Sequence, residues 1–327
     1  MDPFLLALLI VLFGLLFDYT NGFHDAANVV STVIATRVLA PLTAIVLAGV
    51  LNTIGATQAG QVVHTITTGI VHAECVTQIA ILAAVIGAII WNVVTWYLGI
   101  PSSSSYALVG GLIGSTWASI GRADVLWGGI THKVIIPMVL SPIIGYFLAY
   151  FIMKILLFYA AKLEKKNALF KHLQIGSASI VALAHGLNDA QKSMGLITLG
   201  LFASRIIAFP SVPFWVIVAC AVTMGLGTAS GGVRIIRTVG FSITKLNPMQ
   251  GFAAEMSASC VILTASFLGM PISSTHMIVG SITGVGAAKG FRSVRWQVMR
   301  KLSIAWILTL PGAALVSALT WKVFSLL

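Results

Sequence analysis

Residues 92–114 read NVVTWYLGIPSSSSYALVGGLIG, and residues 262–284 read ILTASFLGMPISSTHMIVGSITG. At a constant offset of 170 residues the two segments share Leu-Gly-x-Pro, two following serines, and Val-Gly with a later glycine. An internal repeat of this length indicates that the chain consists of two similar halves. The repeat decides the fold, because it establishes which segments of the two halves correspond to each other.

The composition is typical of a membrane protein. Hydrophobic residues make up 58% of the chain and charged residues 8%, whereas soluble domains carry roughly 25% charged residues. Residues 77–99, for example, contain no charged side chain over a length that crosses a bilayer core of roughly 30 Å. Hydropathy indicates about ten spans, or about five in each half. Because five is an odd number of crossings, the second half must enter the membrane in the opposite orientation to the first. We therefore predict an all-α polytopic membrane protein with two inverted repeats.

The predicted first repeat covers residues 1–160, and the second covers residues 173–327. Between them, residues 161–172 (AKLEKKNALFKH) form a polar, basic linker. Inverted repeats of this kind are typical of transporters, in which discontinuous helices meet near the middle of the bilayer. We accordingly expect broken helices and re-entrant hairpin-like segments in both repeats.

The net charge of +11 could indicate a nucleic-acid partner, but the positions of the basic residues argue against one. Fourteen of the 19 Lys and Arg residues fall on one side of the predicted spans, and Lys192 falls within a span. Only Arg122, Lys133, Arg205 and Lys322 fall on the other side. The positive-inside rule then predicts a cytoplasmic linker and both termini outside, in a cell or inner membrane. No nucleic-acid partner is expected.

Two polar clusters interrupt the apolar spans at an offset of 164 residues. Residues 22–28 read GFHDAAN, and residues 186–192 read GLNDAQK. Since glycine can break a helix, we predict a helix break at Gly22 and another at Gly186. Asp25 and Asp189 each cost roughly 2.5–3.5 kcal/mol at the centre of a membrane helix, which favours a functional role for both carboxylates.

A second pair of motifs consists of proline followed by hydroxyl residues: PSSSS at residues 101–105 and PISSTH at residues 271–276. Proline in the first turn of a helix leaves the neighbouring backbone N–H groups free, and serine hydroxyls add hydrogen-bond donors. Helix N-termini of this kind favour anions. The two motifs therefore predict an anion site built from both halves.

An aspartate beside a bound anion would repel it strongly where the dielectric constant is low. The repulsion disappears if the carboxylates hold cations or protons that move together with the anion. Charge balance therefore predicts cation-coupled anion transport.

In GFHDAAN and GLNDAQK, paired with PSSSS and PISSTH, the chain resembles the inorganic phosphate transporter (PiT) family, in a short, prokaryotic-type form. The resemblance extends over both halves. It implies symport of inorganic phosphate with sodium or protons by alternating access. It also implies a homodimer in the lipid bilayer, with no cofactor beyond the coupling ion.

The resemblance also implies a set of site residues. The predicted phosphate-binding residues are Asn28, Ser103, Ser104, Lys192, Ser273, Ser274 and Thr275. The residues predicted to bind the coupling cation or proton are Asn21, Asp25, Asn188, Asp189 and Glu255, with no metal other than sodium. His24 and Lys192 replace signature asparagines, and Asn52 stands where some sodium-coupled members carry Glu. These departures leave the choice between sodium and a proton open. The roles of His24, His185 and His276 are open as well.

Two alternative functions remain open from the sequence. The first is a symporter of another tetrahedral oxyanion such as sulfate, which at neutral pH cannot donate hydrogen bonds as phosphate can. The second is an uncoupled, channel-like membrane protein, which uptake independent of any ion gradient would favour. An enzyme is not expected, because the sequence shows no nucleophile–base or metal-ligand constellation.

The distribution of basic residues makes a prediction about topology. A cysteine introduced at Asn167, in a background without the three native cysteines, should resist a membrane-impermeant thiol reagent applied outside intact cells. Labelling should appear once the membrane is permeabilised, which serves as the control. Rapid labelling of intact cells would reverse the predicted orientation.

Overall fold

The computed structural model describes residues 2–58, 60–160 and 166–326. Within these ranges the regular structure is helical, with one isolated antiparallel bridge between Val71 and Val125. The predicted all-α class is confirmed. Of the predicted linker, residues 161–165 lie outside the described residues, and residues 166–172 form the start of a long helix.

The helices of the two halves follow one another in the same order. Those of the first half are α1 (Pro3–Ala35), α2 (Pro41–Ala56), α3 (Gln61–Thr68), α4 (Gln78–Tyr97), α5 (Ser104–Ser119), η1 (Arg122–Asp124), α6 (Trp127–Ile130), η2 (Thr131–Ile135) and α7 (Ile136–Ala160). Those of the second half are α8 (Lys166–Ala203), α9 (Phe214–Ser230), α10 (Val233–Phe241), α11 (Pro248–Phe267), α12 (Ser274–Lys289), η3 (Phe291–Ser293) and α13 (Trp296–Phe324). The run of α6, η2 and α7 corresponds to α13.

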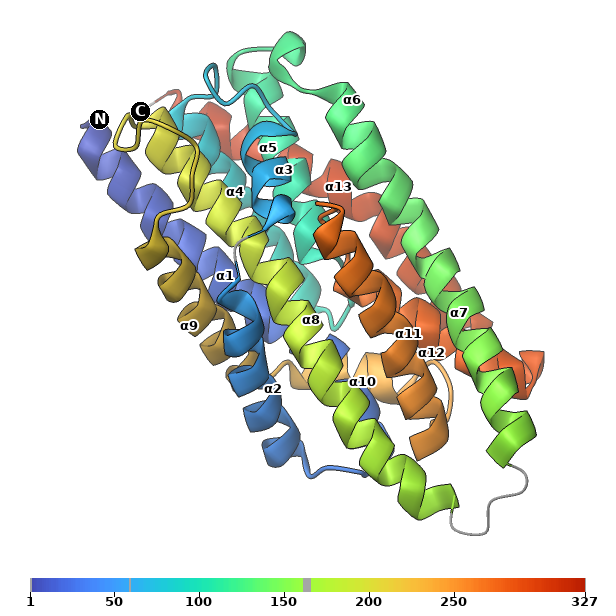
Figure 1. Cartoon of the computed structure of the whole chain (residues 1–327). Coiled ribbons are helices and arrows are strands. Elements are labelled where there is room, and N and C mark those ends of the chain that lie inside the picture. The colour runs from blue at the N-terminus through green and yellow to red at the C-terminus, as the bar shows by residue number, and fades with distance from the viewer. Residues whose placement is uncertain (1, 59, 161–165, 327) are drawn as a thin grey trace.

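The two halves run in opposite directions and are intertwined. Figure 1 shows both termini at one end of the molecule, where α1 begins, whereas the equivalent helix α8 begins at the other end. Helix α1 packs against α9 and α10, and α8 packs against α2 and α3. In the same way α5 packs against α13, and α12 packs against α7. Each half therefore completes the core of the other.

Four helical stretches are long and apolar enough to cross a membrane: α1, α4, residues 127–159 and α13. The number rises to six if the bent pairs α2–α3 and α9–α10 each count as one span. Length and hydropathy thus support fewer spans than the ten or so expected. The other long helices are α5 and α12, of 16 residues each, and the more polar α8 and α11, whose polar side chains are largely buried in the protein.

The broken helices lie elsewhere than predicted. Helices α1 and α8 are continuous through Gly22 and Gly186, so the breaks predicted at these glycines are wrong. The bend instead separates α9 from α10, by 71° across the two glycines between them. The corresponding break in the first half separates α2, which ends at Ala56, from α3, which begins at Gln61.

The glycines of the two clusters serve close helix contact instead. A Cβ atom at Gly22 would lie 2.6 Å from the carbonyl oxygen of Met224 in α9, and 3.0 Å from the Cα atom of Gly227. A Cβ atom at Gly186 would lie 2.8 Å from the Cα atom of Asn52 in α2. Backbones can approach this closely only where no side chain intervenes. The two glycines therefore bring α1 and α8 against helices of the opposite half.

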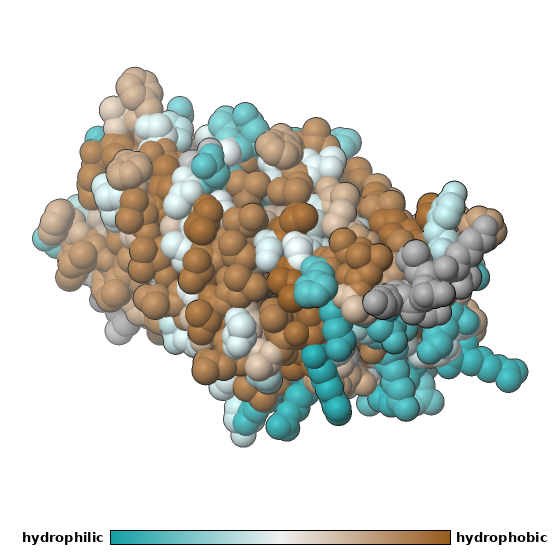
Figure 2. Space-filling view, turned by 60° about the horizontal axis from the view of Figure 1, so that its bottom comes forward, coloured by the Kyte–Doolittle hydropathy of each residue, from teal (hydrophilic) through white to brown (hydrophobic). Residues whose placement is uncertain are grey.

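The surface matches a membrane setting. Figure 2 shows hydrophobic residues over most of the visible face, with most of the long hydrophilic side chains along its lower edge. Exposed residues on the predicted cytoplasmic side include Arg37, Lys171, Arg234, Arg295 and Arg300. Large apolar side chains such as those on α7 and α13 are exposed along the helices, as contact with lipid tails requires.

The glycine contacts predict different outcomes for two substitutions on one helix. Gly186→Ala should lower the melting temperature in detergent, since overpacking a close contact costs about 1–3 kcal/mol. Gly176→Ala, on an exposed turn of α8 with nothing within 4 Å of the new Cβ atom, should leave stability unchanged or raise it. Equal melting temperatures for the two variants would contradict the contact role of Gly186.

Candidate functional site

The proline–serine motifs form the N-termini of two equivalent helices, α5 and α12. Ser103 and Ser273 are their N-caps, and each side-chain oxygen accepts a hydrogen bond of 3.2 Å from the backbone N–H three residues later. This contact satisfies one of the free backbone donors at each helix start. The two predicted site residues thus shape the tips, and the residues that follow them reach the aspartates.

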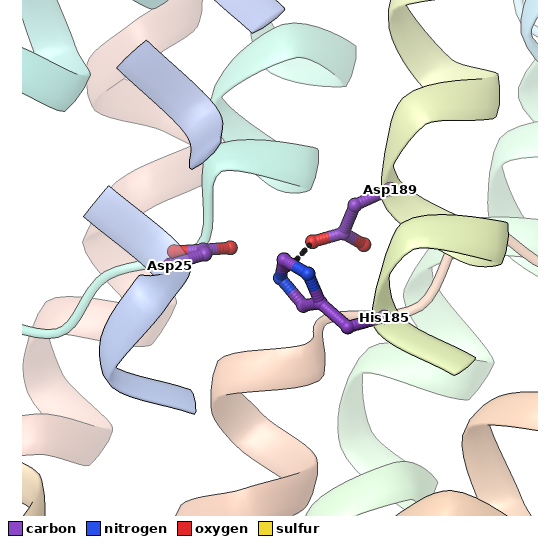
Figure 3. Close-up of side chains that lie close together, drawn as sticks. All are labelled: Asp25, His185 and Asp189. Atoms are coloured by element: carbon purple, nitrogen blue, oxygen red, sulfur yellow. Dashed lines mark ion pairs between the residues drawn. The ribbon is translucent and has the colours of Figure 1, made fainter. Parts of the chain in front are cut away.

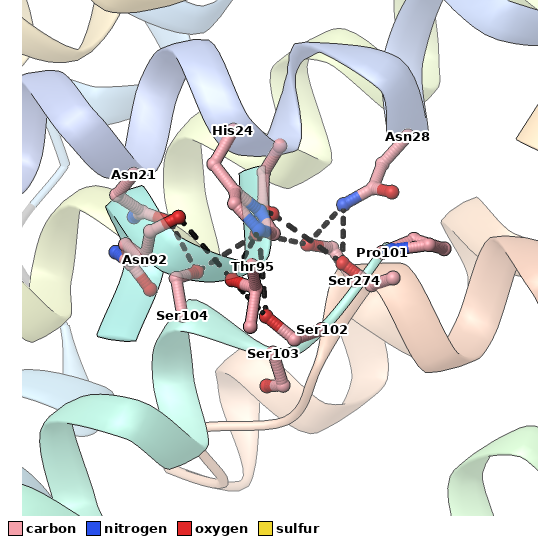
Figure 4. Close-up of polar contacts among 12 residues, drawn as sticks. Asn21, His24, Asn28, Asn92, Thr95, Pro101, Ser102, Ser103, Ser104 and Ser274 are labelled. Carbon is pink, nitrogen blue, oxygen red and sulfur yellow. Dashed lines mark hydrogen bonds and ion pairs between the residues drawn. The ribbon is translucent and has the colours of Figure 1, made fainter. Parts of the chain in front are cut away.

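Asp25, in the middle of α1, is surrounded by hydroxyls from both tips. Its Oδ1 lies 2.7 Å from Nδ1 of His24 and accepts a hydrogen bond of 3.4 Å from Thr275. Its Oδ2 accepts a hydrogen bond of 2.9 Å from Ser104 and lies 3.5 Å from the hydroxyl oxygen of Ser274. Figure 4 shows the first tip, Pro101–Ser104, next to α1, with Ser274 of the second half nearby. One carboxylate therefore contacts both halves.

Asp189, on α8, is the counterpart of Asp25. Its Oδ2 lies 3.0 Å from Nε2 of His185 and accepts a hydrogen bond of 3.0 Å from Ser274. Its Oδ1 forms a close ion pair with the ammonium of Lys192. The hydroxyl of Ser274 thus lies between the two carboxylates, which joins the pair into one buried cluster.

Asn28 and Lys192, each three residues after an aspartate, reach into the opposite half. Asn28 Nδ2 donates to the hydroxyl of Thr275 at 2.9 Å. Lys192 Nζ donates to the hydroxyl of Ser105 at 2.5 Å and to the carbonyl oxygen of Ile272 at 3.0 Å. Lys192 is 1% exposed, so its charge stays inside the cluster.

Asn21 and Asn188 have different surroundings. The amide oxygen of Asn21 contacts the Ser104 hydroxyl, so Asn21 belongs to the cluster. Asn188 Nδ2 instead donates to Ser266 of α11 at 2.8 Å and to the carbonyl oxygen of Met270 at 3.4 Å. Asn188 therefore joins α8 to α11 at the edge of the cluster.

The cluster has a geometry that could hold a cation. Asp25, His185 and Asp189 each offer one ligand atom, and these atoms lie within 4.8 Å of one another. Figure 3 shows the two aspartates on α1 and α8 with the imidazole of His185 between them. Two carboxylates and the ammonium of Lys192 leave a net charge of −1 when His24 and His185 are neutral. One further cation or proton would complete the neutralisation.

Glu255 lies in a second buried cluster. Its carboxylate accepts hydrogen bonds from Thr32 at 2.6 Å, from Gln174 at 3.1 Å and from Ser177. Among the described residues, no hydrogen bond or ion pair joins Glu255 to either aspartate. The structure therefore places Glu255 apart from the other residues predicted for the coupling ion.

The structure separates the three histidines whose roles the sequence left open. His24 and His185 contact Asp25 and Asp189 as described, and Nδ1 of His185 lies 3.0 Å from Oδ1 of Asn52. His276 instead stacks on Trp306, with 4.1 Å between ring centres, and also meets the ring of Tyr106. Its surroundings are those of a packing residue.

Three hydroxyl residues of the site were missed from the sequence. Ser102 and Thr95 lie 3.4 and 3.3 Å from Nε2 of His24, and Ser105 contacts Lys192. Ser102 and Ser105 belong to the PSSSS run, so the whole run was the available signal. Thr95 has no local motif, because its position beside His24 depends on how α4 packs against α1.

Comparison with known proteins relates the chain to one family. The model of a family described as the phosphate transporter family matches residues 21–317. A protein of Rhizobium meliloti (strain 1021), described as "Probable low-affinity inorganic phosphate transporter", is 45% identical over 323 residues, which cover 98% of this chain and 96% of that protein. A protein of Mycobacterium tuberculosis (strain ATCC 25618 / H37Rv) with the same description is 44% identical over 322 residues, which cover 97% of this chain and 77% of that protein.

A solved structure described as "The sodium-dependent phosphate transporter" has the same fold. It matches with a TM-score of 0.85 and 25% sequence identity, over 98% of this chain and 99% of the other. The close agreement in fold at low identity indicates that the arrangement of helices varies less than the sequence.

The ion pair in the cluster predicts a non-additive effect on stability. Lys192→Met and Asp189→Asn should each be destabilising, because removing one partner of a buried ion pair costs about 3–5 kcal/mol. The double variant should lose less than the sum of the two, by roughly 0.5–3 kcal/mol. Melting temperatures of the wild type, the two single variants and the double variant, measured in one detergent, give this double-mutant cycle. Strictly additive losses would show that the two side chains do not stabilise each other.

Proposed function

The chain belongs to the phosphate transporter family, and from this premise we propose that it carries inorganic phosphate together with a coupling cation, sodium or a proton. The observation that supports this best is the hydroxyl of Ser274, which contacts both Asp25 and Asp189. Donors suited to an anion and carboxylates suited to a cation thus occupy one place. The protein binds both partners at once, and their charges compensate each other.

The phosphate is bound by donors from both halves. The starts of α5 and α12 supply backbone N–H groups and the hydroxyls of Ser104, Ser274 and Thr275, which favour an anion at a helix N-terminus. Asn28 and Lys192 add an amide and an ammonium. On binding, these donors turn from the carboxylates to the phosphate oxygens, so the coupling cation must neutralise the carboxylates at the same moment.

Phosphate suits this site better than sulfate for a chemical reason. Any anion bound to the hydroxyls of Ser104 and Ser274 lies next to Asp25 and Asp189, because the same hydroxyls contact both carboxylates. Phosphate carries a proton at neutral pH and can donate a hydrogen bond to a carboxylate. Sulfate has no proton to donate, so its oxygens would face the carboxylates without compensation.

The two aspartates are neutralised differently. Lys192 holds a fixed positive charge against Asp189, whereas Asp25 has His24 and neutral hydroxyl donors. The variable cation therefore belongs near Asp25, within reach of His185 and Asp189. A tethered ammonium in the second half reduces the number of mobile cations needed per phosphate.

Alternating access fits the burial of the site. Asp25, Asp189, Ser104, Ser274 and Lys192 are each 2% exposed or less, so the cluster is closed from both sides of the membrane. Inverted, intertwined halves can exchange conformations and open the site to one side at a time. A continuous, uncoupled channel would not enclose its charged groups in this way. The homodimer and the outward termini remain part of the proposal.

Uptake into proteoliposomes tests the function. Purified protein should accumulate labelled phosphate under an inward sodium or proton gradient, and labelled sulfate should enter much more slowly. Accumulation of sulfate at the same rate would favour the broader oxyanion symporter. Equal uptake with and without any ion gradient would favour the uncoupled channel.

Substitutions at the second tip test the location of the site. The double variant Ser274→Ala and Thr275→Ala should raise the half-saturation concentration for phosphate roughly tenfold to a hundredfold, since a hydrogen bond to a charged group contributes about 1.5–3 kcal/mol. Thr283→Ala is the matched control, because this buried hydroxyl on the same helix bonds back to the carbonyl oxygen of Val279. An unchanged half-saturation concentration in the double variant would place the anion site elsewhere.

A further inference from the structure

A buried row of polar residues follows one face of α1. Asp18, Asn21, Asp25, Asn28 and Thr32 are spaced by three or four residues, which places them on one side of a helix. Each is 5% exposed or less. From Asp18 to Thr32 the row extends for 14 residues, about 21 Å along the helix axis. It covers most of a hydrocarbon core of roughly 30 Å.

Of the two aspartates in this row, Asp18 is the one that the phosphate site does not use. It lies seven residues before Asp25, about 10 Å nearer to the end of the molecule where both termini lie. Apart from the neighbouring Ser193 hydroxyl on α8, its carboxylate oxygens meet no hydrogen-bond donor among the described residues. The side chain is 0% exposed.

No positive charge among the described residues compensates this carboxylate. Within the described residues, the ion pairs of Lys, Arg and His to carboxylates involve only Asp25 and Asp189. The titratable groups near Asp18 are the carboxylate of Asp189 on α8 and the thiol of Cys220 on α9. An isolated carboxylate in such a place costs too much free energy to stay ionised without a bound cation or proton.

The surroundings favour a proton over sodium. Hard cations are bound by several oxygen atoms at once. Helix α1 is continuous through Asp18, so its backbone carbonyls are committed to the helix. Among the described residues, the group of His, Cys, Asp and Glu side chains with metal-ligand spacing consists of Asp25, His185 and Asp189 and does not include Asp18. A proton needs no such shell of ligands, because the neutral carboxylic acid only has to donate to one acceptor.

Asp18 is also connected to the phosphate site. Ser193 follows Asp189 by four residues on α8, so the two side chains share a helix face. On α1, Asn21 lies one turn from Asp18, and its amide oxygen contacts Ser104 of the first tip. Proton movement between Asp18 and the aspartate cluster would therefore follow either of two short rows of polar side chains.

We propose that Asp18 is a proton-binding group of the transport cycle, which takes up the coupling proton and releases it as the site changes its exposure. This inference rests on the proposed function and selects the proton as coupling ion. The carboxylate gains a proton on the side of high proton concentration and returns to the carboxylate form when the proton leaves on the other side. Asp18 is thus distinct from the residues that hold phosphate.

Two assays on the purified full chain in proteoliposomes test the role of Asp18. Net accumulation of labelled phosphate under an imposed pH gradient requires proton release, whereas exchange of labelled for unlabelled phosphate across the membrane does not. Asp18→Asn should keep exchange at the wild-type rate and lose net accumulation. Asp18→Glu should restore accumulation, with a pH dependence shifted towards higher pH because a glutamate has the higher ordinary pKa. Glu74→Gln, which removes an exposed carboxylate, is the control and should change neither assay.

Several results would overturn the inference. Normal accumulation by Asp18→Asn would do so, as would equal loss of exchange and accumulation in a variant that elutes as folded protein. If Asp18→Asn does not fold, Asp18→Glu decides, and an unshifted pH dependence counts against the proposal. Wild-type accumulation driven by sodium and indifferent to the pH gradient would remove proton coupling and leave phosphate transport intact. Absence of both phosphate activities in the wild type would instead refute the proposed function itself.

Discussion

A carboxylate inside a membrane protein must find hydrogen-bond donors or positive charge, and this requirement organises the centre of the molecule. Asp25 and Asp189 lie on α1 and α8, which run in opposite directions in Figure 1. Each helix uses its backbone donors internally, so the aspartates depend on side chains: His24 on α1 beside Asp25, and His185 and Lys192 on α8 beside Asp189. Further donors come from the starts of α5 and α12, above all from Ser274, which contacts both carboxylates. Under the proposed function, an anion that takes these donors leaves the two carboxylates in need of a cation, and this dependence would couple the two substrates.

The two halves satisfy this requirement with similar backbones and different side chains. Asn28 and Lys192 occupy equivalent positions and both donate to a hydroxyl of the opposite tip, Thr275 or Ser105. Only Lys192 carries a charge, so only Asp189 has a permanent partner. Inverted repeats allow such divergence, because the backbone symmetry needed for alternating access does not require identical ligands. Under the proposed function, this asymmetry assigns the mobile cation to the first half and the fixed positive charge of Lys192 to the second.

Some features were open to prediction from sequence and others were not. The repeat, the helical class and the polar clusters at Asp25 and Asp189 follow from local patterns of residues. The helix breaks were placed at the wrong glycines, because glycine serves both to end helices and to bring them close, and the sequence does not distinguish the two. Gly22 and Gly186 prove to be contact sites once α9 and α2 are seen against them. Thr95 was missed for a related reason, since its partner His24 lies on another helix.

The sequence by itself determined that this chain is an inverted-repeat membrane protein with two buried aspartates and two hydroxyl-rich helix starts, because hydropathy, repeat offset and motif chemistry are local properties. Only the tertiary structure decided which groups meet. It placed Ser274 between the two aspartates, separated Glu255 into a cluster of its own and, among the described residues, left Asp18 without a positive partner. Contacts such as those of Ser274 with Asp25 and of Thr32 with Glu255 depend on the exchange of helices between the halves, which joins residues more than 200 positions apart. No local pattern encodes such contacts, since their geometry results from the packing of the whole bundle.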